Sequence, residues 1–286
     1  MKIAFVVEGG LEMGMGHISR SITLAEELGD RTGTCFLTKS DETVVNQITN
    51  AGFRTFKLDN DKEVVKLLQE VRPSIVIIDK LDVEEDFAGK LKDCLNTKVV
   101  IFANLTAANR YADIVINAVT GSKLKNRKFL DENTDTLYFF GPRYYVLREE
   151  FYEFKKKGET LGDKVEKIVL IFGGSDPSNL TPIVLNELLG LSSDFKIDVI
   201  LGVHFVHFDK LNQVLEEYQA KKESVNVHRD IGNVAELMYK ADLVIASPGA
   251  SLFEALCVGT PVIAIYQNSF QENSFGGALP ILKKQK

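Results

Sequence analysis

The stretch KIAFVVEGGLEMGMGHISRSITLAEEL, residues 2–28, decides the fold. Its first six residues, KIAFVV, are mostly apolar and rich in β-branched residues, which predicts a buried strand, and apolar residues then recur at helical spacing from Ile18 to Leu28. The glycines between these two runs allow a sharp turn and a close approach of the backbone to a ligand. A strand, a glycine-rich turn and a helix in this order predict the first βαβ unit of a parallel sheet.

The same alternation of strand-like and helical runs continues along the chain in two series. The strand candidates are residues 2–7, 34–38, 54–58, 74–79, 98–104, 113–119 and 136–141, and then 167–174, 196–202, 225–229, 242–247 and 261–266. The charged stretch at residues 147–167 separates the two series, and we expect the domain boundary inside it. The pattern predicts two tandem α/β, Rossmann-like domains, residues 1–150 and 160–286, with the carboxyl ends of their strands facing one cleft.

Composition and charge narrow the classes of function. The chain has 286 residues, 45% of them hydrophobic, and a formal net charge of -6 without a block of Lys and Arg, so nucleic acid is not expected as a partner. We find no secretory signal and no apolar run near the roughly 20 residues that cross a bilayer, and expect a cytoplasmic protein. Three dispersed cysteines, Cys35, Cys94 and Cys257, indicate reduced, mostly buried thiols.

His17 follows two glycines, Gly14 and Gly16, at the expected start of the first helix. Free amides and the helix dipole favour an anion at such a position. The turn lacks the third glycine of the dinucleotide fingerprint, so NAD binding is disfavoured. From the turn alone, His17 is either an imidazole that caps the helix or a residue that faces a ligand.

The turn IFGGSDPSNLT opens the second series. Gly173 and Gly174 end a strand and suit the close passage of a bound group, while Ser175 or Asp176 can cap a helix with Pro177 at its first position.

A third turn, ASPGASLFEALCVGTP, follows a later strand. Gly249, Ala250 and Ser251 would present free amides at a helix start, which suits a diphosphate. Glu254 lies about one turn further on, where it is either a dipole-favoured side chain or an acceptor for the hydroxyls of a ribose.

The motifs GMGHISR, GPRYYVLREEF, FGGSDPSNLT and SPGASLFEAL with QEN after it resemble the UDP-sugar hydrolases of pseudaminic acid biosynthesis and their spore-coat polysaccharide relatives. These proteins are small members of the GT-B glycosyltransferase superfamily, whose two domains are Rossmann-like. The resemblance covers nearly the whole chain. It implies a GT-B fold, a UDP-sugar as the substrate and no metal or other cofactor.

The resemblance also assigns roles to residues. It implies that His17 is the base that activates water and that Glu254 binds the ribose. The remaining substrate- or nucleotide-binding residues that we expect are Gly14, Gly16, Arg20, Asp79, Gly173, Gly174, Ser175, Asp176, Pro248, Gly249, Ala250, Ser251, Gln271 and Asn273. The other histidines, His204, His207 and His228, are expected to be surface or structural residues.

The chain departs from the family pattern in the half that should hold the sugar. Asp79-Lys80-Leu81 stands where the hydrolases have Asp-His-Tyr, and Ala103-Asn104 stands where they have paired aspartates. The chain also ends soon after the QEN motif, without the long final segment of the superfamily, so it is either a short variant or truncated.

The expected reaction is hydrolysis of a UDP-sugar with inversion, serving surface-polysaccharide or nonulosonic acid synthesis. One alternative is a glycosyltransferase in which His17 activates a sugar hydroxyl. A second is a nucleotide-sugar binding protein without activity. The sequence does not indicate the sugar or the oligomeric state.

Overall fold

The computed structural model describes residues 1–10, 14–118, 126–155, 164–229 and 231–275. The chain divides into two compact units, Met1–Val146 and Leu147–Lys286. The division lies at the start of the charged stretch 147–167. Residues 156–163 of that stretch lie outside the described residues. So do residues 276–286 at the end of the chain, on which the expectation of a short or truncated chain depends.

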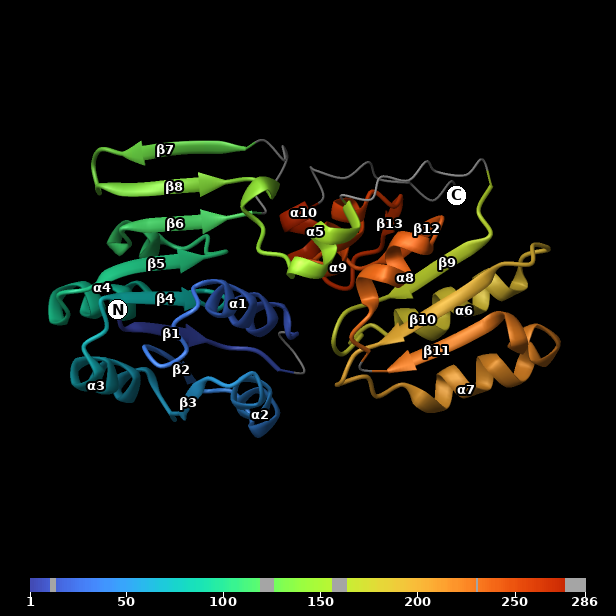
Figure 1. Ribbon diagram of the computed structural model, residues 1–286, viewed down its shortest axis with the longest axis horizontal. Coiled ribbons are helices and arrows are strands. Elements are labelled where there is room, and N and C mark those ends of the chain that lie inside the picture. Colours follow the sequence, from blue (N-terminus) through green and yellow to red (C-terminus); the bar gives the residue numbers. More distant parts are fainter. Residues whose placement is uncertain (11–13, 119–125, 156–163, 230, 276–286) are drawn as a thin grey trace. The chain divides into compact units, whose positions relative to one another are not determined.

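Unit 1 is built on one sheet, which has eight strands among the described residues (Figure 1). The strands are β1 (Ile3–Val7), β2 (Thr34–Thr38), β3 (Arg54–Lys57), β4 (Ile75–Asp79), β5 (Lys98–Phe102), β6 (Ile114–Asn117), β7 (Arg127–Asp131) and β8 (Thr136–Phe140). Their order is β3-β2-β1-β4-β5-β6-β8-β7, and the first six are parallel. The direction of winding reverses between β1 and β4, which is the point where open α/β sheets bind ligands.

Helices cover both faces of this sheet and create two apolar cores. The helices are α1 (Gly16–Glu27), α2 (Glu42–Asn50), α3 (Asp61–Val71) and α4 (Glu85–Cys94), with 3-10 turns η1 (Ala107–Tyr111) and η2 (Pro142–Tyr144). On one face, Ile18 of α1 and Ile48 of α2 are buried with Phe5 of β1. On the other face, Leu68 of α3 and Leu91 of α4 are buried in a second cluster. The apolar periodicity of the sequence therefore corresponds to burial against the sheet.

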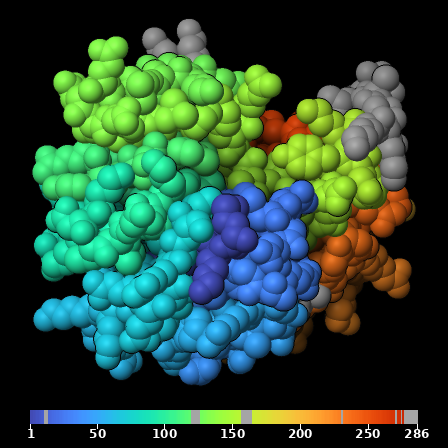
Figure 2. Space-filling model, turned by 60° about the vertical axis from the view of Figure 1, so that its left-hand side comes forward, coloured from blue at the N-terminus to red at the C-terminus, as the bar shows by residue number. Residues whose placement is uncertain are grey.

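The amino-terminal end of the chain, dark blue in Figure 2, lies at the surface of unit 1, where Met1 is 69% exposed. The chain then enters the sheet directly, because β1 is buried along all of its length. A central strand flanked by helices on both faces explains the uninterrupted apolar run IAFVV.

The sequence pattern did not predict β7. This strand pairs antiparallel with β8 at the edge of the sheet, and the turn between them is held by Asp131, which accepts a hydrogen bond from Asn133 N at 3.0 Å. Four of its five residues are exposed, so β7 has no apolar run of the kind that marks a buried strand.

Unit 2 contains a second parallel sheet, with five strands among the described residues. The strands are β9 (Lys167–Ile171), β10 (Lys196–Leu201), β11 (Val225–Arg229), β12 (Leu243–Ala246) and β13 (Val262–Ala264). Their order is β11-β10-β9-β12-β13, so winding reverses between β9 and β12 (Figure 1). The loops after β9 and β12 therefore lie at the expected ligand edge of this sheet.

The second sheet is also covered on both faces. Its helices are α5 (Glu149–Lys155), α6 (Leu180–Gly190), α7 (Phe208–Glu217), α8 (Val234–Lys240), α9 (Ala250–Val258) and α10 (Ser269–Phe275), with the 3-10 turn η3 (Gln219–Ser224). Side chains of α5, α8 and α9 form one core and those of α6 and α7 form the other. Phe151 of α5 is fully buried in the first of these, so the charged stretch begins with an amphipathic helix of unit 2. Among the described residues, no helix has both the length and the apolar character to span a bilayer.

Candidate functional site

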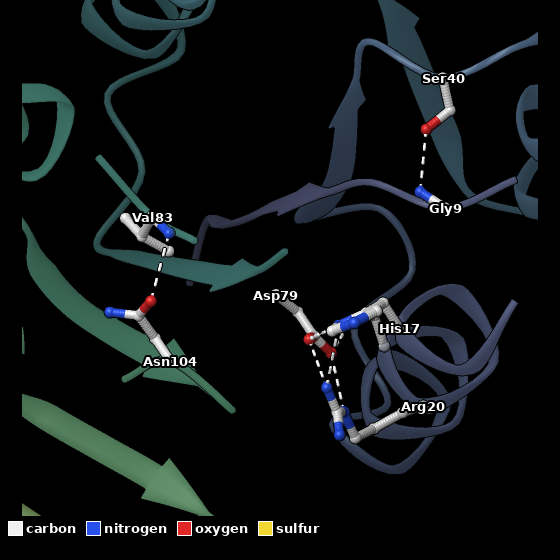
Figure 3. Close-up of polar contacts among 8 residues, drawn as sticks. Gly9, His17, Arg20, Ser40, Asp79, Val83 and Asn104 are labelled. Carbon is white, nitrogen blue, oxygen red and sulfur yellow. Dashed lines mark hydrogen bonds and ion pairs between the residues drawn. The ribbon is translucent and has the colours of Figure 1, made fainter. Parts of the chain in front are cut away.

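The loop between β1 and α1 is folded tightly by its glycines. Gly14 N donates to Gly10 O at 2.8 Å, and both residues have positive φ angles, +77° for Gly14 and +142° for Gly10. Gly9 N donates to Ser40 Oγ at 3.0 Å (Figure 3), and a Cβ on Gly9 would lie 2.6 Å from Ile18. These glycines place the start of α1 at the carboxyl end of β1.

The start of α1 carries His17, as the sequence predicted. Its N-cap residue, Met15, makes no side-chain cap, and the first turn contains no acidic residue. Gly16 is exposed with open space where a side chain would be. Among the described residues, the N-cap of α1 therefore offers the first amides no side-chain acceptor of the kind that usually satisfies a helix N-terminus.

His17 of α1 and Asp79 at the end of β4 form a hydrogen-bonded pair, which Figure 3 shows. His17 Nδ1 lies 2.6 Å from Asp79 Oδ1. Arg20 Nε donates to Asp79 Oδ2 at 2.8 Å, its Nη2 donates to Oδ1, and Ser21 Oγ donates to Oδ2 at 3.0 Å. The sequence predicted His17, Arg20 and Asp79 as separate site residues, and the fold brings them together.

These contacts fix which nitrogen of His17 carries the proton. A carboxylate can only accept a hydrogen bond, so the contact to Asp79 requires a proton on Nδ1. Arg20 Nη2 also lies 3.2 Å from Nδ1, but both groups are then donors, and the shorter contact to the negative charge decides the tautomer. In the neutral imidazole Nε2 is then the acceptor, which is the form that a general base needs.

Asp79 is ionised in this arrangement. It is 1% exposed, and burial opposes its charge, but the neighbouring Arg20 and His17 outweigh burial and hold the pKa of Asp79 well below its usual range. Burial likewise acts to lower the pKa of Arg20, yet Asp79 raises it above the ordinary value. Both oxygens of Asp79 are thus engaged within unit 1, so Asp79 orients His17.

The two departures from the family pattern are buried and paired within unit 1. Lys80 lies 3.5 Å from both Glu8 and Asp61 and 4.6 Å from the centre of the Phe87 ring. Asn104 is 1% exposed and accepts from Val83 N at 3.2 Å (Figure 3). Both side chains therefore stabilise the carboxyl edge of the sheet through partners of their own.

The N-terminus of α9 in unit 2 has no side-chain cap. Its N-cap, Gly249, makes no side-chain cap and no acidic residue lies in the first turn. Ser247, which precedes it, is 6% exposed, and its Oγ has no hydrogen-bond partner among the described residues. A buried hydroxyl without a partner beside an uncapped helix of nine residues is the arrangement that a phosphate group would complete.

Glu254 lies one turn inside α9 and is buried. Arg148 Nη2 lies 3.4 Å from its Oε1. Burial raises the pKa of Glu254, and Arg148 opposes that rise. The sequence placed Glu254 correctly on this helix but gave no sign of its partner, because 106 positions separate the two residues.

The loop after β9 differs from the expectation in one respect. We expected Pro177 at the first helical position, but α6 begins at Leu180. The N-cap residue is Asn179, which makes no side-chain cap. Of the two capping candidates, Ser175 and Asp176, it is Asp176 whose carboxylate accepts from Leu180 N at 2.9 Å and from Thr181 N at 2.8 Å. The carboxylate of Asp176 is thereby engaged by the first amides of α6.

The turn after β10 packs against this loop. His207 Nε2 donates to Asp176 O at 3.0 Å, and His204 N donates to Gly174 O at 3.0 Å. A Cβ on Gly202 would lie 2.3 Å from Gly174 O, so this position has no room for a side chain. The sequence analysis expects both histidines to be surface or structural residues. Their hydrogen bonds to Asp176 O and Gly174 O stabilise the loop after β9.

The last two expected residues, Gln271 and Asn273, lie on α10 and differ in their contacts and exposure. Gln271 Oε1 accepts from Gln267 N at 2.8 Å, and Gln267 Nε2 donates to Phe172 O at 2.8 Å, so these glutamines tie α10 to the loop after β9. The sequence offered no signal for Gln267. Asn273 is exposed.

The three cysteines differ in burial. Cys35 is buried and Cys257 is half-buried, but Cys94 is exposed, so the expectation of mostly buried thiols is wrong for Cys94.

Three relatives share sequence with nearly the whole chain. The uncharacterized protein MJ1062 of Methanocaldococcus jannaschii is 44% identical over 99% of this chain, which spans 59% of that protein's length. Spore coat polysaccharide biosynthesis protein SpsG of Bacillus subtilis is 26% identical over 95% of this chain and 79% of its own length. The UDP-2,4-diacetamido-2,4,6-trideoxy-β-L-altropyranose hydrolase of Campylobacter jejuni is 22% identical over 96% of this chain and 94% of its own.

Solved structures and a family model confirm the predicted fold class. Anabaena HepE in complex with UDP has a TM-score of 0.57 at 16% identity, covering 92% of this chain and 80% of that one. Acinetobacter baumannii MurG has a TM-score of 0.57 at 15% identity, covering 93% and 79%. Residues 168–274, within unit 2, match the glycosyltransferase family 28 C-terminal domain. The chain thus has an α/β fold of the GT-B type with two Rossmann-like units, and it is similar in sequence to a UDP-sugar hydrolase and, in unit 2, to a glycosyltransferase domain.

Proposed function

We propose that this protein hydrolyses a UDP-sugar at its anomeric carbon and releases UDP and the free sugar. The observation that carries the proposal is the 2.6 Å contact between His17 Nδ1 and Asp79, because it leaves Nε2 as a base at the switch point between β1 and β4. The similarity to the hydrolase of Campylobacter jejuni supports water as the acceptor, and the similarity to the spore coat protein of Bacillus subtilis supports a role in surface-polysaccharide synthesis.

In the proposed reaction, His17 Nε2 takes a proton from water while the water oxygen forms a bond to the anomeric carbon. The bond from that carbon to the β-phosphate oxygen breaks, and its electron pair leaves with UDP. Attack from the face opposite the leaving group inverts the anomeric centre. A positioned base contributes on the order of 100- to 10,000-fold to such a step.

Unit 2 binds the nucleotide in this proposal. The amides at the start of α9 and the hydroxyl of Ser247 meet the diphosphate, where negative charge grows as the bond breaks. Glu254 accepts hydrogen bonds from the ribose hydroxyls. Gly173 to Ser175 provide backbone groups along the neighbouring loop.

A second candidate is transfer of the sugar to an acceptor hydroxyl. The match of residues 168–274 to a glycosyltransferase domain favours it. His17 would perform the same proton transfer, and the two reactions differ only in the molecule that attacks.

The test is incubation of the purified chain with a panel of UDP-sugars and no acceptor, followed by chromatography of the nucleotide products. Formation of UDP and free sugar in equal amounts supports hydrolysis. Turnover that starts only after a sugar acceptor is added would move the assignment to transfer. Binding of UDP without turnover under either condition would indicate a binding protein, and tighter binding of CDP or GDP would contradict the uridine assignment.

A further inference from the structure

We propose that Arg148 is a specificity-determining residue, because it keeps Glu254 in the form that accepts hydrogen bonds from both ribose hydroxyls. The nucleotide site of unit 2 then discriminates against 2′-deoxyribonucleotides. This inference rests on the proposed function, since it deepens the role of Glu254. Arg148 has no assigned role in the expected reaction, and all of its contacts that carry the inference lie within unit 2.

Arg148 joins two carboxylates of different surroundings. Its Nη2 lies 3.4 Å from Glu254 Oε1, and its Nη1 lies 2.7 Å from Glu150 Oε1. The side chain of Glu254 is 11% exposed, whereas that of Glu150 is 27% exposed. The guanidinium thus brings one charge to a buried carboxylate that has little access to water.

The charge of Glu254 decides what it can recognise. An ionised carboxylate only accepts hydrogen bonds, so its oxygens can receive both hydroxyl protons of a ribose, whereas a protonated carboxyl group uses one oxygen as a donor. Burial raises the pKa of Glu254, Arg148 lowers it, and the nearby Glu150 adds to the rise. Arg148 is therefore the group that favours the acceptor form of Glu254.

The position of Arg148 is fixed by the helix that follows it. Its guanidinium lies 5.0 Å from the centre of the Phe151 ring, which is fully buried in the core with Ala255 of α9. Cys257 Sγ, also on α9, donates to Phe151 O at 3.7 Å. Since α5 is packed on α9, Arg148 is held beside Glu254 by the fold as well as by charge.

The experiment measures the dissociation constants of UDP and 2′-deoxy-UDP by calorimetry for the full chain and for R148M, R148K and E150Q. We expect the wild type to bind UDP at least about tenfold more tightly than 2′-deoxy-UDP, because a hydrogen bond to a charged group is among the stronger ones. In R148M the ratio falls to within about threefold. R148K retains the charge and keeps a larger ratio than R148M, and E150Q keeps at least the wild-type ratio.

A double-mutant comparison separates action through Glu254 from direct contact with the diphosphate. If Arg148 acts through Glu254, R148M changes neither dissociation constant in an E254Q background. An R148M variant that folds as judged by circular dichroism and keeps the wild-type ratio overturns the inference. So does an equal loss of both nucleotides that persists in the E254Q background.

The same data distinguish this inference from the proposed function. A wild-type chain that binds UDP, paired with an R148M variant of unchanged discrimination, removes the role of Arg148 and leaves the proposed function in place. A wild-type chain that binds neither nucleotide overturns the proposed function and this inference with it.

Discussion

His17 and Asp79 meet at the reversal of strand order in unit 1, one from the helix after β1 and the other from the end of β4, with 2.6 Å between Nδ1 and Oδ1. Asp79 accepts from Arg20 and Ser21 at the same time. The carboxylate is therefore held from several sides, and it holds the imidazole in one orientation and one tautomer.

Replacing Asp79 by asparagine should reduce kcat by about 100- to 10,000-fold, because the amide no longer selects the His17 tautomer that accepts a proton at Nε2. The dissociation constant of UDP should change by less than about twofold, since Asp79 lies in unit 1. Steady-state kinetics and calorimetry measure the two effects. S21A removes only one of the donors to Asp79 and is the matched control. Wild-type kcat in D79N would refute the orienting role.

Asp79 should also make stability depend on acid pH. The pKa of Asp79 in the folded protein lies well below the ordinary value of 3.8. The charged carboxylate therefore stabilises the fold at pH values above the pKa of the unfolded chain, and this contribution is lost as the pH falls towards the folded pKa. D79N lacks this titration. At neutral pH, breaking this buried ion pair should make the free energy of unfolding of D79N lower than that of the wild type by about 3 kcal/mol or more. This difference should shrink below about pH 4, where the wild type loses the contribution of Asp79. Denaturant titrations at several pH values test this, and a deficit that grows with acidity would count against it.

The cap on α6 should contribute to the stability of unit 2. D176A removes the acceptor for the amides of Leu180 and Thr181, so the free energy of unfolding should fall by about 1–2 kcal/mol. D176N keeps one acceptor oxygen and should lose less. Chemical denaturation measures the difference, and equal stabilities of D176A and wild type would show that the cap contributes nothing.

Gly202 should be intolerant of any side chain. A methyl group there would meet Gly174 O at 2.3 Å, so G202A must displace the loop after β9 and should both destabilise unit 2 and weaken UDP binding. Gly232 has nothing within 4 Å of the same added atom, which makes G232A the matched control. Thermal unfolding and calorimetry compare the two variants. UDP binding in G202A equal to that in G232A would show that the nucleotide does not depend on this loop.

Much of the fold was predictable from sequence because buried parallel strands leave apolar runs. The runs at 2–7 and 74–79 correspond to β1 and β4. The helix after β1 carries His17, and the end of β4 carries Asp79, to the same edge of the sheet. The strand β7 was not predictable, because it lies exposed at the sheet edge and three of its five residues are charged.

The sequence indicated which residues belong to the candidate site better than it indicated which of them contact one another. Arg148 reaches Glu254 across 106 positions, and His207 reaches Asp176 across 31, so neither pair has a local pattern. Asp176 was expected to serve both as a cap and as a nucleotide ligand, and the actual start of α6 at Leu180 explains why the cap takes its carboxylate.

The central claim is tested most directly by H17Q assayed on the UDP-sugar that the wild type turns over best, with UDP release and UDP affinity measured on the same preparation. Glutamine retains a polar side chain of similar reach but cannot act as a base at neutral pH. The account predicts that UDP release falls by about 100-fold or more while UDP affinity stays within about twofold of wild type. Release of UDP by H17Q at the wild-type rate would contradict it.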